Sequence, residues 1–290
     1  MTSRRDRADE EFTADVLAWG VPRLRDLPWR QTRDPWAVLV SEVMLQQTQV
    51  TRVIPRWHAF LERFPTPDAC AVAPLGDVLR EWQGLGYPRR ARNLHATARR
   101  VTESGGFPRD LAGLLALPGV GPYTARAVMA FACELDAAVV DTNIARVYAR
   151  VAGERLTPTR VQAMADAACP SGDAWVWNQC LMDLGAVLCR PAKPGCGECP
   201  VRRGCAWGGN PDVPDPAVGS SGVSGRQANF DGSDRQARGR LMKALGDGPV
   251  ARTDVAVVMQ RYAATAARLV AALIDEGLCQ PDRLTIRLPG

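Results

Sequence analysis

The sequence predicts an all-α body of roughly ten short helices, followed by a linker and a small C-terminal module. Between Phe12 and about Val187 the apolar residues recur mostly at spacings of three and four, which is the period of a helix face. Breaks rich in Pro and Gly separate these stretches, for example at 64–67 and 118–121. An α/β sheet would need β-branched runs that this part of the sequence lacks.

The composition changes after Cys205. Residues 208–225 are dense in Gly, Pro, Ser and Asp, which indicates a linker, and we place it at 208–229. Residues 230–290 regain helical periodicity and end in 284–288, a candidate short strand. This order suits a winged-helix-like module, and a helical cap packed on the main body fits nearly as well.

Length, charge and cysteine content narrow the protein class. With 290 residues and 46% hydrophobic residues the chain can bury a real core. A net charge of +5 mildly favours a polyanionic partner. The N-terminus has no apolar stretch typical of a secretory signal, and no run of eighteen apolar residues suggests a membrane span. Nine cysteines without an export signal argue against a disulfide framework, so a reducing cytoplasm and a metal centre are expected.

Four cysteines lie within seventeen residues, in the spacing C-x6-C-x2-C-x5-C, and are interleaved with Pro and Gly: Cys189, Cys196, Cys199 and Cys205. Structural zinc sites usually have two close pairs, whereas only one close pair occurs here, which makes zinc the weaker candidate. Four thiolates from one compact loop suit a [4Fe-4S] cluster. The other five cysteines have no such grouping and are expected to be small buried hydrophobes.

A possible phosphate-binding turn precedes an acidic residue. Gly119 and Gly121 flank one apolar residue, which permits a tight turn with amide groups facing outward, although Pro122 at the first turn of a helix is the ordinary explanation. Twenty residues beyond Gly121, Asp141 follows apolar residues at a helix start. By itself Asp141 would be interpreted as an N-cap.

The hairpin, the spacing to the acid and the cysteine loop together resemble the endonuclease III superfamily of helix-hairpin-helix DNA glycosylases. The resemblance implies two helical subdomains flanking a DNA-binding cleft, with domains at 1–30 plus 136–207 (iron-sulfur) and at 31–135 (six helices with the hairpin). The C-terminal module at 230–290 follows from the change in composition alone. It implies a [4Fe-4S] cluster on the four cysteines, phosphate contact at Gly119 and Gly121, and catalysis by Asp141. A fixed carboxylate stabilises the oxocarbenium character that develops when an N-glycosidic bond breaks.

Lyase members of this superfamily use a lysine two residues after the second hairpin glycine, where this chain has Tyr123. The only lysines are Lys193 and Lys243, so no amine is placed for imine chemistry. We therefore expect a monofunctional hydrolase.

Basic residues also surround the cysteine loop. They would either contact DNA phosphates or form a solvated loop, and we give the two interpretations equal weight.

The segments 41–50 and 84–87 resemble the MutY adenine glycosylases. In that family the glutamate matching Glu42 protonates adenine at N7, and burial on an apolar helix should raise its pKa. The resemblance also places Gln46 and Gln47 near the strand opening, Tyr87 as a wedge beside the opposite base, and Tyr123 and Asn143 around the sugar. Tyr87 as a core aromatic is the alternative. Arg89, Arg90 and Arg92 form a basic face for which phosphate contact is favoured.

The resemblance covers roughly residues 10–207, with two departures. Thr142 stands where many MutY proteins have Gly, and the residues after the linker are too few for the MutT-like domain that reads 8-oxoguanine. We expect a monomeric, bacterial-type cytoplasmic enzyme at the nucleoid that removes adenine opposite 8-oxoguanine or guanine from double-stranded DNA in base excision repair. The alternatives are a thymine or uracil mismatch glycosylase and a non-catalytic iron-sulfur DNA-binding protein.

Overall fold

The computed structural model describes residues 4–220, 222–223 and 229–290, and these divide into two compact units that we treat separately. Unit 1 contains the described residues of Met1–Pro35, Arg109–Leu111 and Gly121–Arg226. Unit 2 contains those of Trp36–Pro108, Ala112–Val120 and Gln227–Gly290. The expected linker at 208–229 lies partly outside the described residues.

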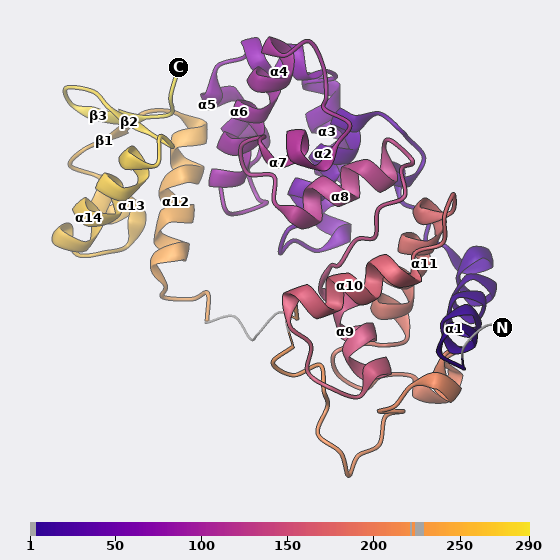
Figure 1. Ribbon diagram of the computed structural model, residues 1–290. Coiled ribbons are helices and arrows are strands. Elements are labelled where there is room, and N and C mark those ends of the chain that lie inside the picture. Colours follow the sequence, from indigo (N-terminus) through magenta and orange to yellow (C-terminus); the bar gives the residue numbers. More distant parts are fainter. Residues whose placement is uncertain (1–3, 221, 224–228) are drawn as a thin grey trace. The chain divides into compact units, whose positions relative to one another are not determined.

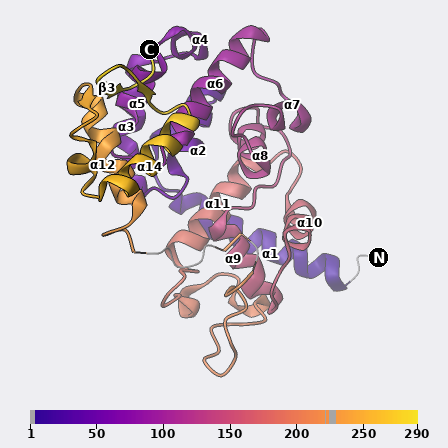
Figure 2. The ribbon, with the colours of Figure 1, turned by 90° about the vertical axis from the view of Figure 1, so that its left-hand side faces the viewer.

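Unit 1 is a helical bundle built around α11. Its helices are α1 (Arg4–Gly20), α8 (Pro122–Phe131), α9 (Thr142–Ala152), α10 (Pro158–Ala168) and α11 (Ala174–Val187), with short 3-10 turns at Val21–Arg23, Pro28–Arg30, Cys196–Glu198 and Arg202–Gly204. Helix α11 packs against α1 and α9 (Figure 2). Its side chains Trp177, Leu181 and Leu184 are completely or almost completely buried, because α11 is apolar on most of its surface.

The N-terminal part of unit 2 is a second helical bundle. Its helices are α2 (Pro35–Leu45), α3 (Val50–Arg63), α4 (Pro67–Val72), α5 (Leu75–Glu81), α6 (Arg89–Glu103) and α7 (Leu111–Leu115), the last of which begins at the unit boundary (Figure 1). Trp36, Phe60 and Trp82 form an aromatic core with ring centroids about 6 Å apart. The indole N–H of Trp36 donates to the carbonyl of Phe64 at 2.9 Å, so this buried polar atom is satisfied.

The C-terminal part of unit 2 is a small winged-helix-like module. Its elements are α12 (Asp234–Asp247), β1 (Val250–Ala251), α13 (Val255–Met259), α14 (Ala263–Asp275), β2 (Gln280–Pro281) and β3 (Thr285–Arg287). The strands form an antiparallel sheet in the order β1-β3-β2, with Ile286 opposite Val250 and Pro281. The strand expected at 284–288 is confirmed. Strands β1 and β2 were not expected, because two residues are too few to show alternation.

The module is joined to the helices of unit 2 by hydrogen bonds to its backbone carbonyls. The amide of Gly76 in α5 donates to the carbonyl of Pro289 at 2.9 Å, and the side-chain amide of Gln83 donates to the carbonyl of Met242 at 2.8 Å. A Cβ atom at Gly76 would lie 2.5 Å from that same Pro289 oxygen. The two parts therefore meet so closely at α5 that only glycine fits.

Within the described part of the chain, we find no helix with the length and apolar character needed to cross a membrane.

Candidate active site

Glu42 is a buried carboxylic acid on α2. Residues Trp36 to Met44 of this helix are all buried, since the sequence PWAVLVSEVML is apolar around its whole circumference. Glu42 itself is only 4% exposed, which is deeper than the half-buried position expected from the sequence. A carboxyl group in such surroundings is held away from bulk water.

Gln46 and Gln47 lie in the turn that ends α2. Gln46 is half-buried and Gln47 is exposed. Gln47 has a φ of 57°, a left-handed backbone conformation that is uncommon outside glycine. The turn therefore presents the Gln47 side chain to solvent at a backbone cost, a pattern found at functional sites.

Tyr87 ends a turn with an unusual backbone. Gly84, Gly86 and Tyr87 have φ values of 86°, 73° and 49°. The Tyr87 side chain is 37% exposed, which excludes the alternative of a core aromatic. A tyrosine held in a left-handed conformation and pointing outward is strained, and the surrounding structure must compensate for the strain.

Arg90 provides that compensation. Its guanidinium donates to the carbonyls of Val43 (2.7 Å) and Gln46 (2.7 Å) at the end of α2, and to those of Leu85 (2.9 Å) and Gly86 (3.1 Å) in the turn before Tyr87. Burial lowers the pKa of Arg90 to about 10, so the group is still charged at neutral pH. Arg90 thus ties together the two loops that carry Gln46, Gln47 and Tyr87.

The structure corrects the expectation that Arg89, Arg90 and Arg92 together form a basic face for phosphate contact. The Arg90 donors bind backbone carbonyls rather than facing solvent, and Arg92 donates to the carbonyl of Glu276 and to the side chain of Asn93. Only Arg89, whose side chain is 63% exposed, keeps the exposure expected of a phosphate contact. Sequence proximity could not separate these roles, because consecutive residues on a helix face different neighbours.

The hairpin turn joins α7 to α8. Gly119 has a φ of 76°, and a Cβ atom there would lie 2.7 Å from the side chain of Asn93 on α6. Thr97 on the same helix donates to the carbonyl of Pro118 at 2.8 Å, which fixes the turn on α6. Gly121 is the residue before α8, and Pro122 occupies the first helical position as expected. Tyr123 follows in the first turn of α8 and is half-buried.

Asp141 caps α9 and is paired with Asn143. One carboxylate oxygen accepts from the amide of Ile144 at 2.7 Å, and the other accepts from the Asn143 side chain at 2.8 Å. Burial raises the pKa of Asp141, although these hydrogen bonds oppose the rise. The N-cap interpretation is confirmed, and the hydrogen bonds fix the direction of the carboxylate.

Arg146 connects this pair to the cysteine loop. It donates to the side-chain oxygen of Asn143 at 2.8 Å, to the carbonyl of Gly185 at 2.7 Å and to the carbonyl of Cys189 at 2.7 Å. Arg146 is 3% exposed, so the guanidinium that links Asn143 to Cys189 is shielded from water, whereas Asp141, Asn143 and Cys189 are half-buried. Sequence reasoning missed this residue, although an arginine one turn after a helix-capping pair was a usable signal.

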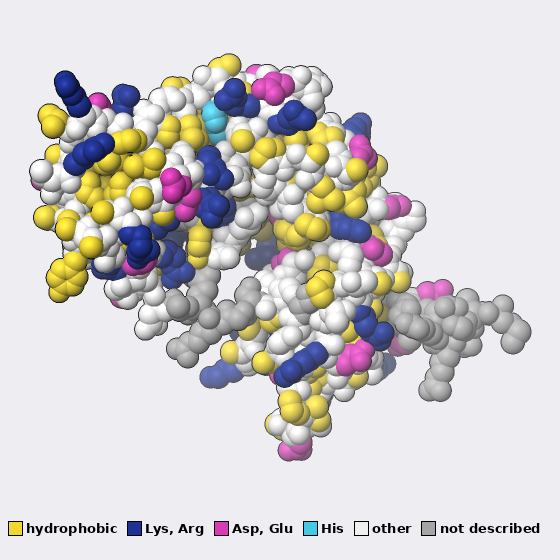
Figure 3. Space-filling model, turned by 60° about the vertical axis from the view of Figure 1, so that its left-hand side comes forward, with side chains coloured by type: hydrophobic (Ala, Val, Ile, Leu, Met, Phe, Trp, Pro, Cys, Tyr) yellow, Lys and Arg dark blue, Asp and Glu magenta, His cyan; other side chains and the backbone are white. Residues whose placement is uncertain are grey.

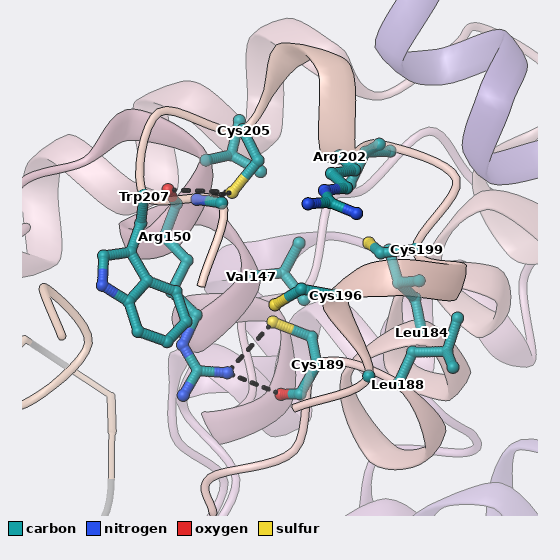
Figure 4. A pocket seen from close by; sticks show the side chains of 14 residues that line it. Val147, Arg150, Leu184, Leu188, Cys189, Cys196, Cys199, Arg202, Cys205 and Trp207 are labelled. Carbon is teal, nitrogen blue, oxygen red and sulfur yellow. Dashed lines mark hydrogen bonds between the residues drawn. The ribbon is translucent and has the colours of Figure 1, made fainter. Parts of the chain in front are cut away.

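All four predicted ligand cysteines line one pocket of unit 1 (Figure 4). Its walls are apolar side chains of α9 and α11 together with Arg150, Arg202 and Trp207. Arg150 donates to the sulfur of Cys189 at 3.3 Å, and the amide of Gly208 donates to that of Cys205 at 3.4 Å. In the described residues, no three His, Cys, Asp or Glu side chains lie close enough to hold a single metal ion.

Comparison with known proteins identifies the family. Residues 40–170 match the model of the HhH-GPD superfamily base excision DNA repair protein. The chain is 41% identical over 275 residues to an adenine DNA glycosylase of Mycolicibacterium smegmatis, covering 92% of each chain. The chain belongs to the adenine DNA glycosylase family of the HhH-GPD superfamily.

Other relatives of this glycosylase family agree. An adenine DNA glycosylase of Mycobacterium tuberculosis is 41% identical over 286 residues, covering 91% of this chain and 88% of its own. The human adenine DNA glycosylase is 40% identical over 215 residues, covering 67% of this chain and 39% of its own.

Solved structures support the same glycosylase fold. A thermostable thymine-DNA glycosylase matches with a TM-score of 0.66 at 29% identity, covering 71% of this chain and 99% of that one. A trapped endonuclease III–DNA covalent intermediate matches with a TM-score of 0.62 at 25% identity, covering 72% and 98%. The all-α, helix-hairpin-helix glycosylase architecture predicted from the sequence is thereby confirmed.

Proposed function

We propose that this chain is a monofunctional DNA glycosylase that hydrolyses the N-glycosidic bond of adenine mispaired with 8-oxoguanine or guanine. The observation that carries the proposal is the 41% sequence identity, over nearly the full length of this chain, to enzymes named adenine DNA glycosylase. A buried glutamate on α2 and a fixed aspartate at the start of α9 supply the two carboxyl groups that the reaction needs. The partner is double-stranded DNA, and the proposed site of action is the bacterial nucleoid, with the enzyme as a monomer.

The two carboxyl groups take different roles. Glu42, buried among apolar side chains, holds the proton that it delivers to N7 of adenine, which turns the base into a better leaving group. Asp141, oriented by Asn143 and the amide of Ile144, keeps a carboxylate beside the sugar as positive charge develops there. Gln46, Gln47 and Tyr87 hold the opened strand, Gly119 and Gly121 contact its phosphates, and Tyr123 and Asn143 line the sugar pocket.

A strand-nicking activity is not expected. Tyr123 occupies the hairpin position at which an imine-forming amine would stand, and a phenol cannot form an imine with the sugar. Lys193 lies in the cysteine loop and Lys243 lies in α12. Water is therefore the final acceptor of the sugar in this proposal.

Base release from four duplexes tests the function. The duplexes carry A opposite 8-oxoguanine, A opposite guanine, T opposite guanine and U opposite guanine, and product is measured under single-turnover conditions with and without alkali. We expect adenine release, with strand breaks only after alkali. Release of thymine or uracil would instead support the activity named for the thymine-DNA glycosylase relative, and efficient borohydride trapping would contradict the hydrolase assignment.

Two glutamate variants sharpen the test. Glu42→Gln keeps the shape of the side chain but removes the proton, and we expect adenine release to fall at least about 100-fold. Glu62→Gln changes an exposed glutamate on α3 and serves as the matched control, with wild-type activity. Equal activity of the two variants would exclude Glu42 as the acid.

We also propose a [4Fe-4S] cluster at the cysteine pocket. The pocket fits such a group, because Cys189, Cys196, Cys199 and Cys205 all line it and a cubane takes four thiolates, each at a different iron atom. When bound, the cluster would cross-link the loop at residues 189–205 and would supply a redox-active group. Anaerobically purified protein should be brown and contain iron and sulfide, whereas colourless protein with zinc would refute the assignment.

A further inference from the structure

Residues 206–220 follow the last cysteine of the pocket, and most of them belong to the segment expected to be a linker. They pack against unit 1. The amide of Trp207 donates to the carbonyl of Arg150 in α9 at 3.1 Å. Further along, Ser220 is 5% exposed, and its hydroxyl oxygen accepts from the amide of Leu156 at 3.1 Å. We call residues 206–220 the covering segment.

The start of the covering segment lies against the cysteine pocket. Trp207 and Gly208 line this pocket, and the amide of Gly208 donates to the sulfur of Cys205 at 3.4 Å. A Cβ atom at Gly209 would come within 2.7 Å of the sulfur of Cys196. The backbone therefore approaches two of the four sulfur atoms as closely as glycine permits.

Arg150 lies between the covering segment and the cysteine loop. Its side chain is 2% exposed. The guanidinium donates to the sulfur of Cys189 at 3.3 Å and to the carbonyl of the same residue at 3.2 Å (Figure 4). It also donates to the carbonyl of Arg190 at 2.8 Å. One buried cation thus contacts both a sulfur of the pocket and the backbone that carries it.

The covering segment holds the other side of this guanidinium. The carboxylate of Asp215 accepts two hydrogen bonds from Arg150, at 3.1 and 2.6 Å, and the amide of Ala217 donates to the same carboxylate at 3.0 Å. The ring of Trp207 lies against the guanidinium, with its centroid 4.7 Å from the central carbon. Two parallel hydrogen bonds and a stacked ring fix the direction of an arginine more firmly than one contact does.

The charges of the covering segment do not suit DNA phosphates. It contains no Lys or Arg, and its two charged residues are Asp212 and Asp215. Its exposed residues 210–214 form the loop at the bottom of Figures 1 and 3, where Figure 3 shows apolar and acidic side chains. Phosphates repel such a surface, so we look for the role of Asp215 inside the protein.

We propose that the covering segment is part of the cluster site and that Asp215 is a positioning residue, which holds the guanidinium of Arg150 against the sulfur of Cys189. Hydrogen bonds to the sulfur atoms and nearby charge set the reduction potential of an iron-sulfur cluster. The positive charge of Arg150 favours the reduced, more negative state, and the paired carboxylate offsets part of that effect. This inference rests on the cluster proposed above.

A pair of aspartate variants tests the inference on anaerobically purified protein. Asp215→Asn keeps the shape of the side chain but leaves the charge of Arg150 uncompensated. We expect the reduction potential, measured by voltammetry, to become more positive, and the release of iron to a chelator to become about tenfold faster. Asp212→Asn removes the same charge from an exposed position of the covering segment and should match wild type in both measurements.

A double variant shows whether Asp215 acts through Arg150. Arg150→Gln removes the cation, so its reduction potential should become more negative than that of wild type. The double variant Arg150→Gln with Asp215→Asn should release iron no faster than Arg150→Gln alone. Additive effects on iron release would overturn the proposal. If Arg150→Gln fails to fold, the comparison of Asp215→Asn with Asp212→Asn still decides.

Iron content keeps the inference and the proposed cofactor distinguishable. If wild type contains iron and sulfide but Asp215→Asn behaves as Asp212→Asn, the inference fails and the proposed cluster stands. If wild type contains no iron, the proposed cluster fails. The rate at which iodoacetamide alkylates Cys189, followed by mass spectrometry, then tests the contact itself. A faster rate in Asp215→Asn than in Asp212→Asn supports the positioning of Arg150, and equal rates overturn it.

Discussion

Arg146 donates a hydrogen bond of 2.7 Å from its Nε atom to the backbone carbonyl of Cys189, the first cysteine of the pocket. The same guanidinium holds the side chain of Asn143, which in turn donates to Asp141. The direction of the proposed catalytic carboxylate therefore depends on where the cysteine loop lies. Because Arg146 itself is buried, water cannot replace its hydrogen-bond partners at low cost.

The first prediction concerns Arg146. Arg146→Lys keeps the charge but cannot reach Asn143, Gly185 and Cys189 together, since an ammonium lacks the planar fork. We expect a loss of about 2–4 kcal/mol in the free energy of unfolding and a fall in base release. Denaturant unfolding and single-turnover kinetics measure the two effects. Arg155→Lys, a substitution elsewhere in unit 1, is the control, and equal behaviour of the two variants would contradict the role of the network.

The second prediction concerns Asp141. Asparagine is as good an N-cap as aspartate, so Asp141→Asn should change the free energy of unfolding by less than about 1 kcal/mol. It removes the negative charge beside the sugar, and we expect base release to fall by about 100-fold or more. Unchanged base release would refute the mechanism.

The raised pKa of Asp141 also predicts how the rate of base release depends on pH. Burial raises its folded pKa, and the reaction needs the ionised carboxylate, so activity should be lost as the pH falls through that raised pKa, at a pH above the ordinary value for aspartate. A pH–rate profile of single-turnover base release measures this acidic limb. A limb at or below the ordinary value would contradict the assignment.

The third prediction concerns the buried ion pair of unit 1. Arg30 binds the carboxylate of Asp183 with two hydrogen bonds of 2.9 Å, and the amide of Arg25 adds one of 3.0 Å. Burial alone would raise the pKa of Asp183, but these hydrogen bonds and charges outweigh it and the pKa is lowered. Asp183→Ala leaves Arg30 buried and unpaired, which we expect to cost about 3–5 kcal/mol.

The sign of the pH effect follows from the lowered pKa. The stabilisation by Asp183 is present above its unfolded pKa of about 3.9 and is lost as the pH falls through the folded value. The free energy of unfolding of the wild type, measured between neutral pH and about pH 2, should therefore fall below about pH 4. Asp183→Asn should flatten this acidic decline, and an unchanged decline would show that other carboxylates cause it.

The fourth prediction concerns Gly119. Its left-handed backbone and the 2.7 Å approach of Asn93 leave no place for a methyl group, so Gly119→Ala should lower the free energy of unfolding by about 1–3 kcal/mol. DNA affinity should fall as well, because the amide groups of the hairpin shift. Gly105→Ala is the control. Gly105 has the same left-handed backbone conformation, but a Cβ atom there would meet no neighbouring atom, so the substitution introduces backbone strain without a steric clash.

Much of the fold was predictable because its signals are local. Apolar spacing indicates helices from the residues themselves, and Asp141 and Pro122 mark helix starts through their own chemistry. The spacing of the four cysteines predicted a shared pocket for the same reason, since a chain of seventeen residues with interleaved Pro and Gly readily folds on itself. The three-stranded sheet was only partly predicted, because β1 and β2 are two-residue strands defined by their partner β3.

By itself the sequence determined the helical body, the grouping of the four cysteines and the lack of an amine at position 123, and it suggested the roles proposed for Glu42 and Asp141. Only the tertiary structure decided that Arg90 serves backbone carbonyls instead of phosphate, that Arg146 links Asp141 to Cys189, and that Arg235 contacts Tyr87 across 148 residues. The reason is physical. A side chain's type and its helix face follow from local sequence, whereas the partner of a buried guanidinium depends on which distant carbonyls and rings packing brings within 3 Å or so of it.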